Sequence, residues 1–126
     1  MVAVSCQDAL VWSLTPGQAG DGPEGRQLIE AIGVQDAPVY LLMDSAYGGN
    51  DLRAAALERN LQPVVPAHPQ RKLPWPLDKQ RYRQRNEVER LFRRIKAYRR
   101  VFTRYDKLDV VYAAFVSMAL ILEHLR

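Results

Sequence analysis

The amino-acid sequence predicts an α/β fold that consists of a β-hairpin, a strand–helix–strand unit and two C-terminal helices. Three observations support this prediction. Two short apolar segments near the N-terminus flank a tight turn, a continuous apolar run at 39–43 precedes a helix and a second strand, and the residues from 79 onward show helical periodicity. The chain of 126 residues has room for one hydrophobic core, so we expect a single domain over 1–126.

The N-terminal segment predicts a hairpin and a helix. Residues 2–6 and 10–14 have the composition of short strands, with a tight turn at 7–9 between them. The Gly- and Pro-rich stretch at 15–23 predicts a loop. Apolar residues then recur at helical spacing over 24–32, and the glycine that follows is a natural residue to end that helix.

The central segment predicts a βαβ unit. The continuous apolar run at 39–43 is typical of a strand buried on both faces, and it ends at Asp44. A glycine-bearing turn then leads into a helix that Asn50 or Asp51 can cap. A further short strand at 62–66 should lie parallel to the first one, because a helix connects the two.

Two helices complete the predicted fold. A Pro-rich, basic connection covers 67–78, and Trp75 within it is expected to pack against the loop rather than stack on a base. A long helix is expected from about Lys79 to Arg99, and a final helix from about Lys107 to His124 is apolar almost all round and therefore expected in the core. The predicted buried stripe of the long helix consists of Val88, Leu91, Phe92 and Ile95.

Charge is distributed unevenly along the chain. The net charge is +4, but the segment from Arg71 to Lys107 holds fourteen Lys and Arg residues and four acids, which gives a local net charge of +10. The remaining residues include four basic and ten acidic ones, for a net charge of −6. Such a dense basic segment is the pattern expected of a nucleic-acid partner, and a solvated basic helix is the alternative.

Composition also bears on the compartment. The longest apolar stretch, 110–122, is shorter than the roughly 20 residues that span a bilayer, and no secretory signal follows Met1. The single Cys6 fits a reducing environment. We therefore expect a cytoplasmic, nucleoid-associated protein with no membrane partner.

Glu89 is the first candidate for chemistry. On one uninterrupted helix, Tyr82, Arg85, Glu89 and Lys96 would fall within a sector of about 60° beside the apolar stripe. A half-buried carboxylate among cations stays ionised and can hold a metal ion near bound DNA. The alternative is that Glu89 only forms i,i+4 ion pairs with neighbouring arginines, and the spacing alone favours this alternative.

Asp44 is the second candidate. It follows a strand that is predicted to be parallel, at the edge of the sheet where ligands bind in open α/β folds. A strand-ending turn residue or helix cap is an equally good interpretation of this position. Taken with the basic helix, the two acids indicate a metal-dependent phosphoryl-transfer site that acts on nucleic acid.

Segment 82–96 carries a specific motif. Its sequence, Tyr-Arg-Gln-Arg-Asn-Glu-Val-Glu-Arg-Leu-Phe-Arg-Arg-Ile-Lys, matches all four positions of the Y-(2)-R-(3)-E-(6)-K signature of bacterial insertion-sequence DDE transposases. The stretches 98–107, 41–47 and 14–21 are also similar to segments of that family. The chain therefore resembles these transposases, of the insertion-sequence type four/five superfamily, over nearly its whole length.

This resemblance implies an RNase H-like fold that cleaves and joins DNA at insertion-sequence ends by metal-dependent phosphoryl transfer. It implies that Asp44 and Glu89 are the second and third acids of the DDE triad and ligands of Mg²⁺ or Mn²⁺, with two ions only in the complete site. It also implies homo-oligomers in the complete enzyme. The implied DNA-binding residues are Tyr82, Arg85, Arg93, Lys96, Arg99 and Arg100.

The first acid of the triad has no counterpart in this sequence. In the family it lies on the first, central strand, upstream of the hairpin, and neither Asp8 in the predicted turn nor Asp21 in the predicted loop matches that position. We therefore expect an incomplete RNase H-like fold that lacks its first central strand, as the C-terminal part of the catalytic domain, inactive alone.

Three origins are compatible with such a chain: a gene remnant, the downstream frame of a frameshifting element, or a half completed in trans by an upstream transposase fragment. The alternative function is that of a non-catalytic DNA-binding remnant, or of an accessory or inhibitory module. Dependence on Glu89 and on a divalent metal distinguishes an enzyme from such a module.

Overall fold

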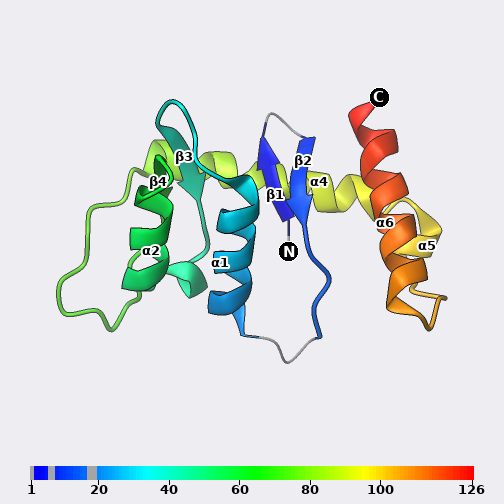
Figure 1. The fold of residues 1–126 in the computed structure, drawn as a ribbon, viewed down its shortest axis with the longest axis horizontal. Helices are drawn as coiled ribbons and strands as arrows, with labels where there is room; N and C mark the ends of the chain where they lie inside the picture. Colours follow the sequence, from blue (N-terminus) through cyan, green and yellow to red (C-terminus); the bar gives the residue numbers. More distant parts are fainter. Residues whose placement is uncertain (1, 6–7, 17–19) are drawn as a thin grey trace. The chain divides into compact units, whose positions relative to one another are not determined.

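The structure is a computed structural model of the chain and describes residues 2–5, 8–16 and 20–126. The chain divides into two compact units. Unit 1 contains residues 1–15 and 86–126, and unit 2 contains residues 16–85. Figure 1 shows both as a ribbon and labels most of their helices and strands. Every helix in the described part of the chain is too short or too polar to cross a lipid bilayer.

Unit 1 combines an antiparallel hairpin with three helices. Its elements are β1 (Val2–Ser5), β2 (Asp8–Trp12), α4 (Asn86–Ile95), α5 (Arg99–Phe102) and α6 (Asp109–His124). Apolar residues of the three helices form its core, and Trp12 and Tyr112 pack against them. The buried members of this core are Leu91, Ile95, Val101, Val116 and Ala119.

Unit 2 contains the predicted βαβ arrangement. Its elements are α1 (Asp21–Ile32), β3 (Val39–Leu42), the 3₁₀ helix η1 (Ser45–Tyr47), α2 (Asn50–Leu57), β4 (Leu61–Val64), α3 (Lys79–Tyr82) and the 3₁₀ helix η2 (Arg83–Arg85). β3 and β4 pair in parallel, as predicted. The buried cluster of this unit consists of Ile29, Leu52, Ala56 and Leu61. The fold is therefore mixed α/β with a small parallel sheet.

Two glycines shape the first helix of unit 2. Gly33 ends α1 as predicted: its φ of +77° is a conformation that glycine adopts readily, and its N–H donates to the Ile29 carbonyl. Gly25 permits close packing, because a Cβ at this position would lie 2.8 Å from Tyr47 Cδ1 and 3.3 Å from Leu52 Cδ2. The absence of a side chain at Gly25 therefore lets α1 approach η1 and α2.

The hairpin and the loop after it differ from the prediction. Asp8 and Ala9 belong to β2, because the antiparallel register pairs them with Ser5 and Val4. Cys6 and Gln7, which were predicted in the first strand and in the turn, lie outside the described part of the chain. Asp21 is the first residue of α1, so the predicted loop ends earlier than residue 23.

Burial of the strand before Asp44 on both faces was a wrong prediction. Val39 and Tyr40 are 45% and 50% exposed, whereas Leu41 and Met43 pack against the apolar cluster of unit 2. Among the described residues, β3 has a hydrogen-bonded neighbour only in β4. A strand in a two-stranded sheet has one unpaired edge, and other elements cover its faces only in part. An apolar sequence therefore does not ensure that the strand is buried.

The final helix is also less buried than predicted. α6 contributes Val116 and Ala119 to the core of unit 1, whereas Val110 and Ile121 are 80% and 58% exposed. Only one face of the helix packs against α4, α5 and β2. Among the described residues of unit 1, no element covers the other faces of this helix.

The predicted long helix from Lys79 to Arg99 is divided. The 3₁₀ helix η2 separates α3 from α4, and α4 ends at Ile95. Beyond Ile95 the N–H groups of Ala97 and Tyr98 donate to carbonyls three residues earlier, which tightens the last turn. Tyr98 then adopts an extended conformation as the N-cap of α5, so the helical path is broken there.

Asn50 and Asp51 do not cap α2 as predicted. The N-cap is Gly49, and no side chain caps this end of the helix. The Asn50 side chain instead accepts a hydrogen bond from Arg71 Nη2 at 2.6 Å. The Asn50 side chain therefore binds Arg71, 21 residues later in the sequence, instead of capping its own helix.

Candidate catalytic and DNA-binding residues

Asp44 lies just beyond the carboxyl end of β3, as predicted. The main chain leaves the sheet after the Met43 N–H bonds to the Val64 carbonyl, and Asp44 takes the N-cap position of η1. Its side chain does not cap that helix. The carboxylate instead accepts a hydrogen bond from Ser45 Oγ at 3.1 Å. Unit 2 therefore presents Asp44 at the end of its parallel sheet.

Arg85 is brought close to Asp44. The guanidinium Nη1 lies 3.7 Å from Asp44 Oδ2, and the two side chains are 31% and 52% exposed. The Arg85 guanidinium also lies 5.8 Å from the centroid of the Tyr82 ring. At this exposure and distance the ion pair contributes at most about 1 kcal/mol, so its main effect is to place a cation beside the carboxylate.

Glu89 belongs to unit 1, on α4. Its side chain is exposed, so the prediction that it is half-buried is wrong. The buried face of α4 is formed by Leu91 and Ile95, while Phe92, predicted on the same stripe, is 39% exposed. Next to Glu89 on this helix, Arg90 forms an ion pair with Glu87.

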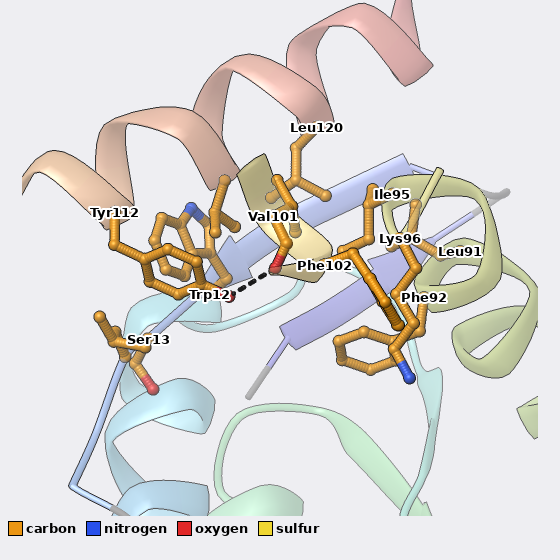
Figure 2. A pocket seen from close by; sticks show the side chains of 12 residues that line it. Trp12, Ser13, Leu91, Phe92, Ile95, Lys96, Val101, Phe102, Tyr112 and Leu120 are labelled. Carbon is orange, nitrogen blue, oxygen red and sulfur yellow. Dashed lines mark hydrogen bonds between the residues drawn. The ribbon is translucent and has the colours of Figure 1, made fainter. Parts of the chain in front are cut away.

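Lys96 immediately follows α4 and borders an apolar groove of 310 Å³ in unit 1. Figure 2 shows its side chain beside Phe92, with Phe102 and Tyr112 among the other side chains that line the groove. The Tyr112 hydroxyl donates to the Val101 carbonyl at 3.1 Å, which connects α6 to α5 at the groove wall. This groove could not be predicted from the sequence, because its walls come from separate segments of the chain.

The other predicted DNA-binding arginines are exposed in unit 1. Arg99 Nε donates to the Tyr105 hydroxyl at 3.0 Å. Arg100 lies over the Phe115 ring, 4.6 Å from its centroid, and Nη1 is 3.8 Å from Asp106 Oδ1. These contacts leave both guanidiniums at the surface, where phosphate groups can reach them.

A buried carboxylate connects α4 to the end of α6, and the sequence analysis did not identify it. The Glu123 side chain is only 4% exposed and lies 3.0 Å from Arg94 Nε. The Tyr98 hydroxyl donates to Glu123 Oε1 at 3.2 Å. Burial, followed by this hydrogen bond and the charge of Glu123, raises the pKa of Tyr98. This group holds α4, the helix of Glu89, against α6.

A second cluster that the sequence analysis missed lies in unit 2. The guanidiniums of Arg53 and Arg71 lie over the Trp75 indole, 3.9 and 4.1 Å from the ring centroid. Trp75 Nε1 donates to the Val65 carbonyl at 2.6 Å, which confirms the predicted packing of this tryptophan against its loop. The signal in the sequence was weak, since Arg53 lies outside the basic segment.

Asp44 and Glu89 have the chemistry of magnesium ligands. Carboxylate oxygens suit Mg²⁺ and Mn²⁺, and Mg²⁺ often uses one or two carboxylates together with water and substrate phosphates. Both side chains are exposed. Across residues 2–5, 8–16 and 20–126, no three His, Cys, Asp or Glu side chains gather in a group that could hold a metal ion. Each of these carboxylates is therefore, taken singly, a chemically suitable ligand for such an ion.

Comparison with known proteins identifies the family. The family model described as "Transposase DDE domain" matches residues 8–123. A Brucella ovis protein named "Putative transposase for insertion sequence element IS6501" is 30% identical over 115 residues, which cover 89% of this chain and 85% of that protein. No solved structure matches the chain. The chain thus belongs to the transposase DDE domain family of insertion-sequence transposases.

Proposed function

We propose that this chain acts in DNA transposition as the C-terminal part of a DDE catalytic domain, and that Asp44 and Glu89 are two of its three catalytic carboxylates. One observation carries the proposal: Asp44 stands at the carboxyl end of the parallel sheet beside the signature residue Arg85. The family match over 8–123 includes both acids and the whole signature segment. The proposed reaction is cleavage and joining of DNA at insertion-sequence ends.

Asp44 and Glu89 would hold Mg²⁺ or Mn²⁺, with two ions in the complete site. The bound ions supply activation of the attacking hydroxyl group and stabilisation of the leaving oxygen. Arg85 offers a guanidinium beside Asp44, and the same donors can bind a phosphate oxygen. We therefore propose that Arg85 positions the DNA backbone next to the carboxylate.

DNA is the proposed macromolecular partner. The segment from Arg71 to Lys107 has a net charge of +10, and each phosphate contact releases counterions from DNA. Binding should therefore weaken strongly as the salt concentration rises. The side chains proposed to contact DNA are Tyr82, Arg85, Arg93, Lys96, Arg99 and Arg100.

We further propose that the third carboxylate comes from an upstream transposase fragment and that this chain is inactive alone. The resemblance implies only Asp44 and Glu89 as members of the triad, and the described residues hold no group of three metal-binding side chains. The upstream strand would complete an RNase H-like sheet by pairing with the open edge of β3. A homo-oligomer on DNA, associated with the nucleoid, is the proposed assembly.

The alternative is a non-catalytic DNA-binding or inhibitory module. The exposed basic side chains favour DNA binding whether or not catalysis occurs. This alternative predicts that Glu89→Gln leaves DNA binding unchanged and that DNA binding does not depend on a divalent metal.

The test is a strand-nicking assay on DNA that carries the element's own ends. The chain is assayed alone and with the peptide encoded immediately upstream, with and without Mn²⁺. We expect metal-dependent nicking only with the upstream peptide, and its loss in Asp44→Asn and Glu89→Gln.

Matched variants control for the loss of one negative charge. Asp36→Asn changes an exposed acid of unit 2, and Glu87→Gln changes an acid on the helix that carries Glu89. Both should retain nicking. Intact DNA binding without nicking under any of these conditions would support the non-catalytic module instead.

A further inference from the structure

Two arginines in unit 2 share one aromatic ring, and no acidic side chain in the described part of the chain pairs with them. The Cζ atoms of Arg53 and Arg71 lie 3.9 and 4.1 Å from the Trp75 centroid, so the two positive charges are within about 8 Å of each other. Within the described part of the chain, neither guanidinium forms an ion pair with a carboxylate. Asp51, in the first turn of the helix that carries Arg53, also forms no ion pair with either arginine. Two like charges are thus held close together, and no carboxylate of the described residues forms an ion pair with either of them.

The cluster is fixed in place by hydrogen bonds. Arg71 donates to Asn50 Oδ1 at 2.6 Å and to the Leu73 carbonyl at 3.1 Å, and Trp75 donates to the Val65 carbonyl at 2.6 Å. These bonds tie the Pro-rich connection to the start of α2 and to the end of β4. The positions of the guanidiniums are therefore set before any ligand arrives, which lowers the entropic cost of binding.

Arg53 retains unused hydrogen-bonding capacity. Its Nη1 atom is buried and has no hydrogen-bond partner among the described residues. Burial, and then the charge of Arg71, lowers the pKa of Arg53. An anion beside both guanidiniums would offset the repulsion between the two charges and accept hydrogen bonds from their other N–H groups.

The cluster adjoins the loop that follows Asp44. A Cβ at Gly48 would lie 3.8 Å from Trp75 Cζ2 and only 3.1 Å from the Ser45 carbonyl oxygen. Gly48 directly follows η1, whose N-cap is Asp44. The indole therefore packs over the turn that connects the candidate catalytic acid to α2, all within unit 2.

We propose that Arg53 and Arg71, held on Trp75, form a binding site for a phosphodiester group of the DNA backbone. Guanidinium groups offer paired N–H donors that match phosphate oxygens, and a planar guanidinium stacks on an aromatic ring without losing those donors. The location next to the Asp44 turn favours DNA over free phosphate, since a strand that reaches Asp44 would pass this loop. This inference rests on the proposed function, because it takes DNA as the partner.

The test measures binding of the full chain to a short labelled DNA duplex of mixed sequence, by fluorescence anisotropy over a range of salt concentrations. Loss of one phosphate contact should reduce the slope of log affinity against log salt by about 0.9 and weaken binding at low salt roughly tenfold. We expect this from Arg53→Gln and from Arg71→Gln. Arg26→Gln, an exposed arginine on α1, should change neither quantity.

A second measurement uses Trp75 as a reporter and does not depend on the stability of the arginine variants. The chain has two tryptophans, so Trp12→Phe leaves Trp75 as the emitter. Addition of DNA should change its emission, and inorganic phosphate at millimolar concentration should not reproduce that change. If phosphate alone reproduces it, the site binds small anions and the DNA assignment is wrong.

The two proposals fail in different ways. If the wild-type chain binds DNA but Arg53→Gln and Arg71→Gln behave like Arg26→Gln, and Trp75 emission is unchanged by DNA, this site is refuted and the proposed function stands. If the wild-type chain does not bind DNA at any salt concentration, the proposed function is refuted together with the site.

Discussion

Replacement of Arg94 by methionine should destabilise unit 1 by leaving a buried carboxylate without its nearest cation. Glu123 is 4% exposed, and Arg94 Nε lies 3.0 Å from its Oε2 atom. Removing one partner of a buried ion pair costs about 3–5 kcal/mol. The Arg94 side chain is itself 31% exposed, and Glu123 keeps the Tyr98 hydroxyl and the exposed Arg126 nearby. We therefore expect a loss of about 2 kcal/mol in the free energy of unfolding.

Urea denaturation followed by circular dichroism measures this loss. For a small protein with a slope of about 1–2 kcal/mol per molar urea, the midpoint should fall by roughly 1–2 M. Arg93→Met is the matched control, because it removes the same charge from an exposed neighbouring position on α4. The double variant Arg94→Met/Glu123→Gln should be less destabilised than Arg94→Met, since no buried charge is left unpaired.

Equal urea midpoints for Arg94→Met and Arg93→Met would refute the reasoning, because the ion pair between Arg94 and Glu123 would then contribute nothing to the free energy of unfolding. The result also bears on function. Glu89 lies on the same helix as Arg94, so a looser contact between α4 and α6 should reduce nicking by the reconstituted enzyme even though the variant changes no proposed catalytic residue.

Three further predictions concern stability. The pKa of Tyr98 is raised above its ordinary value of 10.0, so the folded state favours the protonated phenol. The stability that this phenol contributes is fully present below pH 10 and is lost as the pH rises through the raised pKa. Tyr98→Phe should therefore flatten the fall of the thermal midpoint at alkaline pH. Gly25→Ala should cost about 1–3 kcal/mol in urea unfolding, despite the better helix propensity of alanine, because its Cβ would meet the Tyr47 ring at 2.8 Å; an unchanged or higher midpoint would show that the ring moves freely. Gly33→Ala should cost a similar 1–3 kcal/mol from backbone strain alone, since no atom lies within 4 Å of the added Cβ and φ +77° with ψ −173° is a region that essentially only glycine adopts; a urea midpoint equal to that of the wild type would contradict this strain.

Local sequence signals were sufficient for the elements that depend on neighbouring residues. Helical spacing before Gly33 located α1, and the strand–helix–strand succession predicted the parallel pairing of β3 with β4. The acid at the end of the apolar run is where β3 leaves the sheet. The signature segment at 82–96 identified the family, which the matches confirm. These features follow from steric and hydrogen-bonding preferences that act within a few residues.

Burial could not be read from the same patterns. The apolar sequences of β3 and α6 predicted full burial, yet Val39 and Val110 are 45% and 80% exposed. An apolar residue is buried only if another element covers it, and periodicity carries no information about whether that element is present. The same limitation applies to Glu89, whose exposure depends on what packs beside α4.

The contacts that give the candidate sites their chemistry were decided by the tertiary structure alone. Arg85 forms an ion pair with Asp44, and Arg94 forms one with Glu123. Arg71 donates a hydrogen bond to the Asn50 side chain. Each pair joins residues far apart in the sequence, so no local propensity specifies it. The sequence by itself determined the residue types, the order of the elements and the family. Which charges lie close together was determined by the packing of those elements, because electrostatic interactions depend on distance in space rather than along the chain.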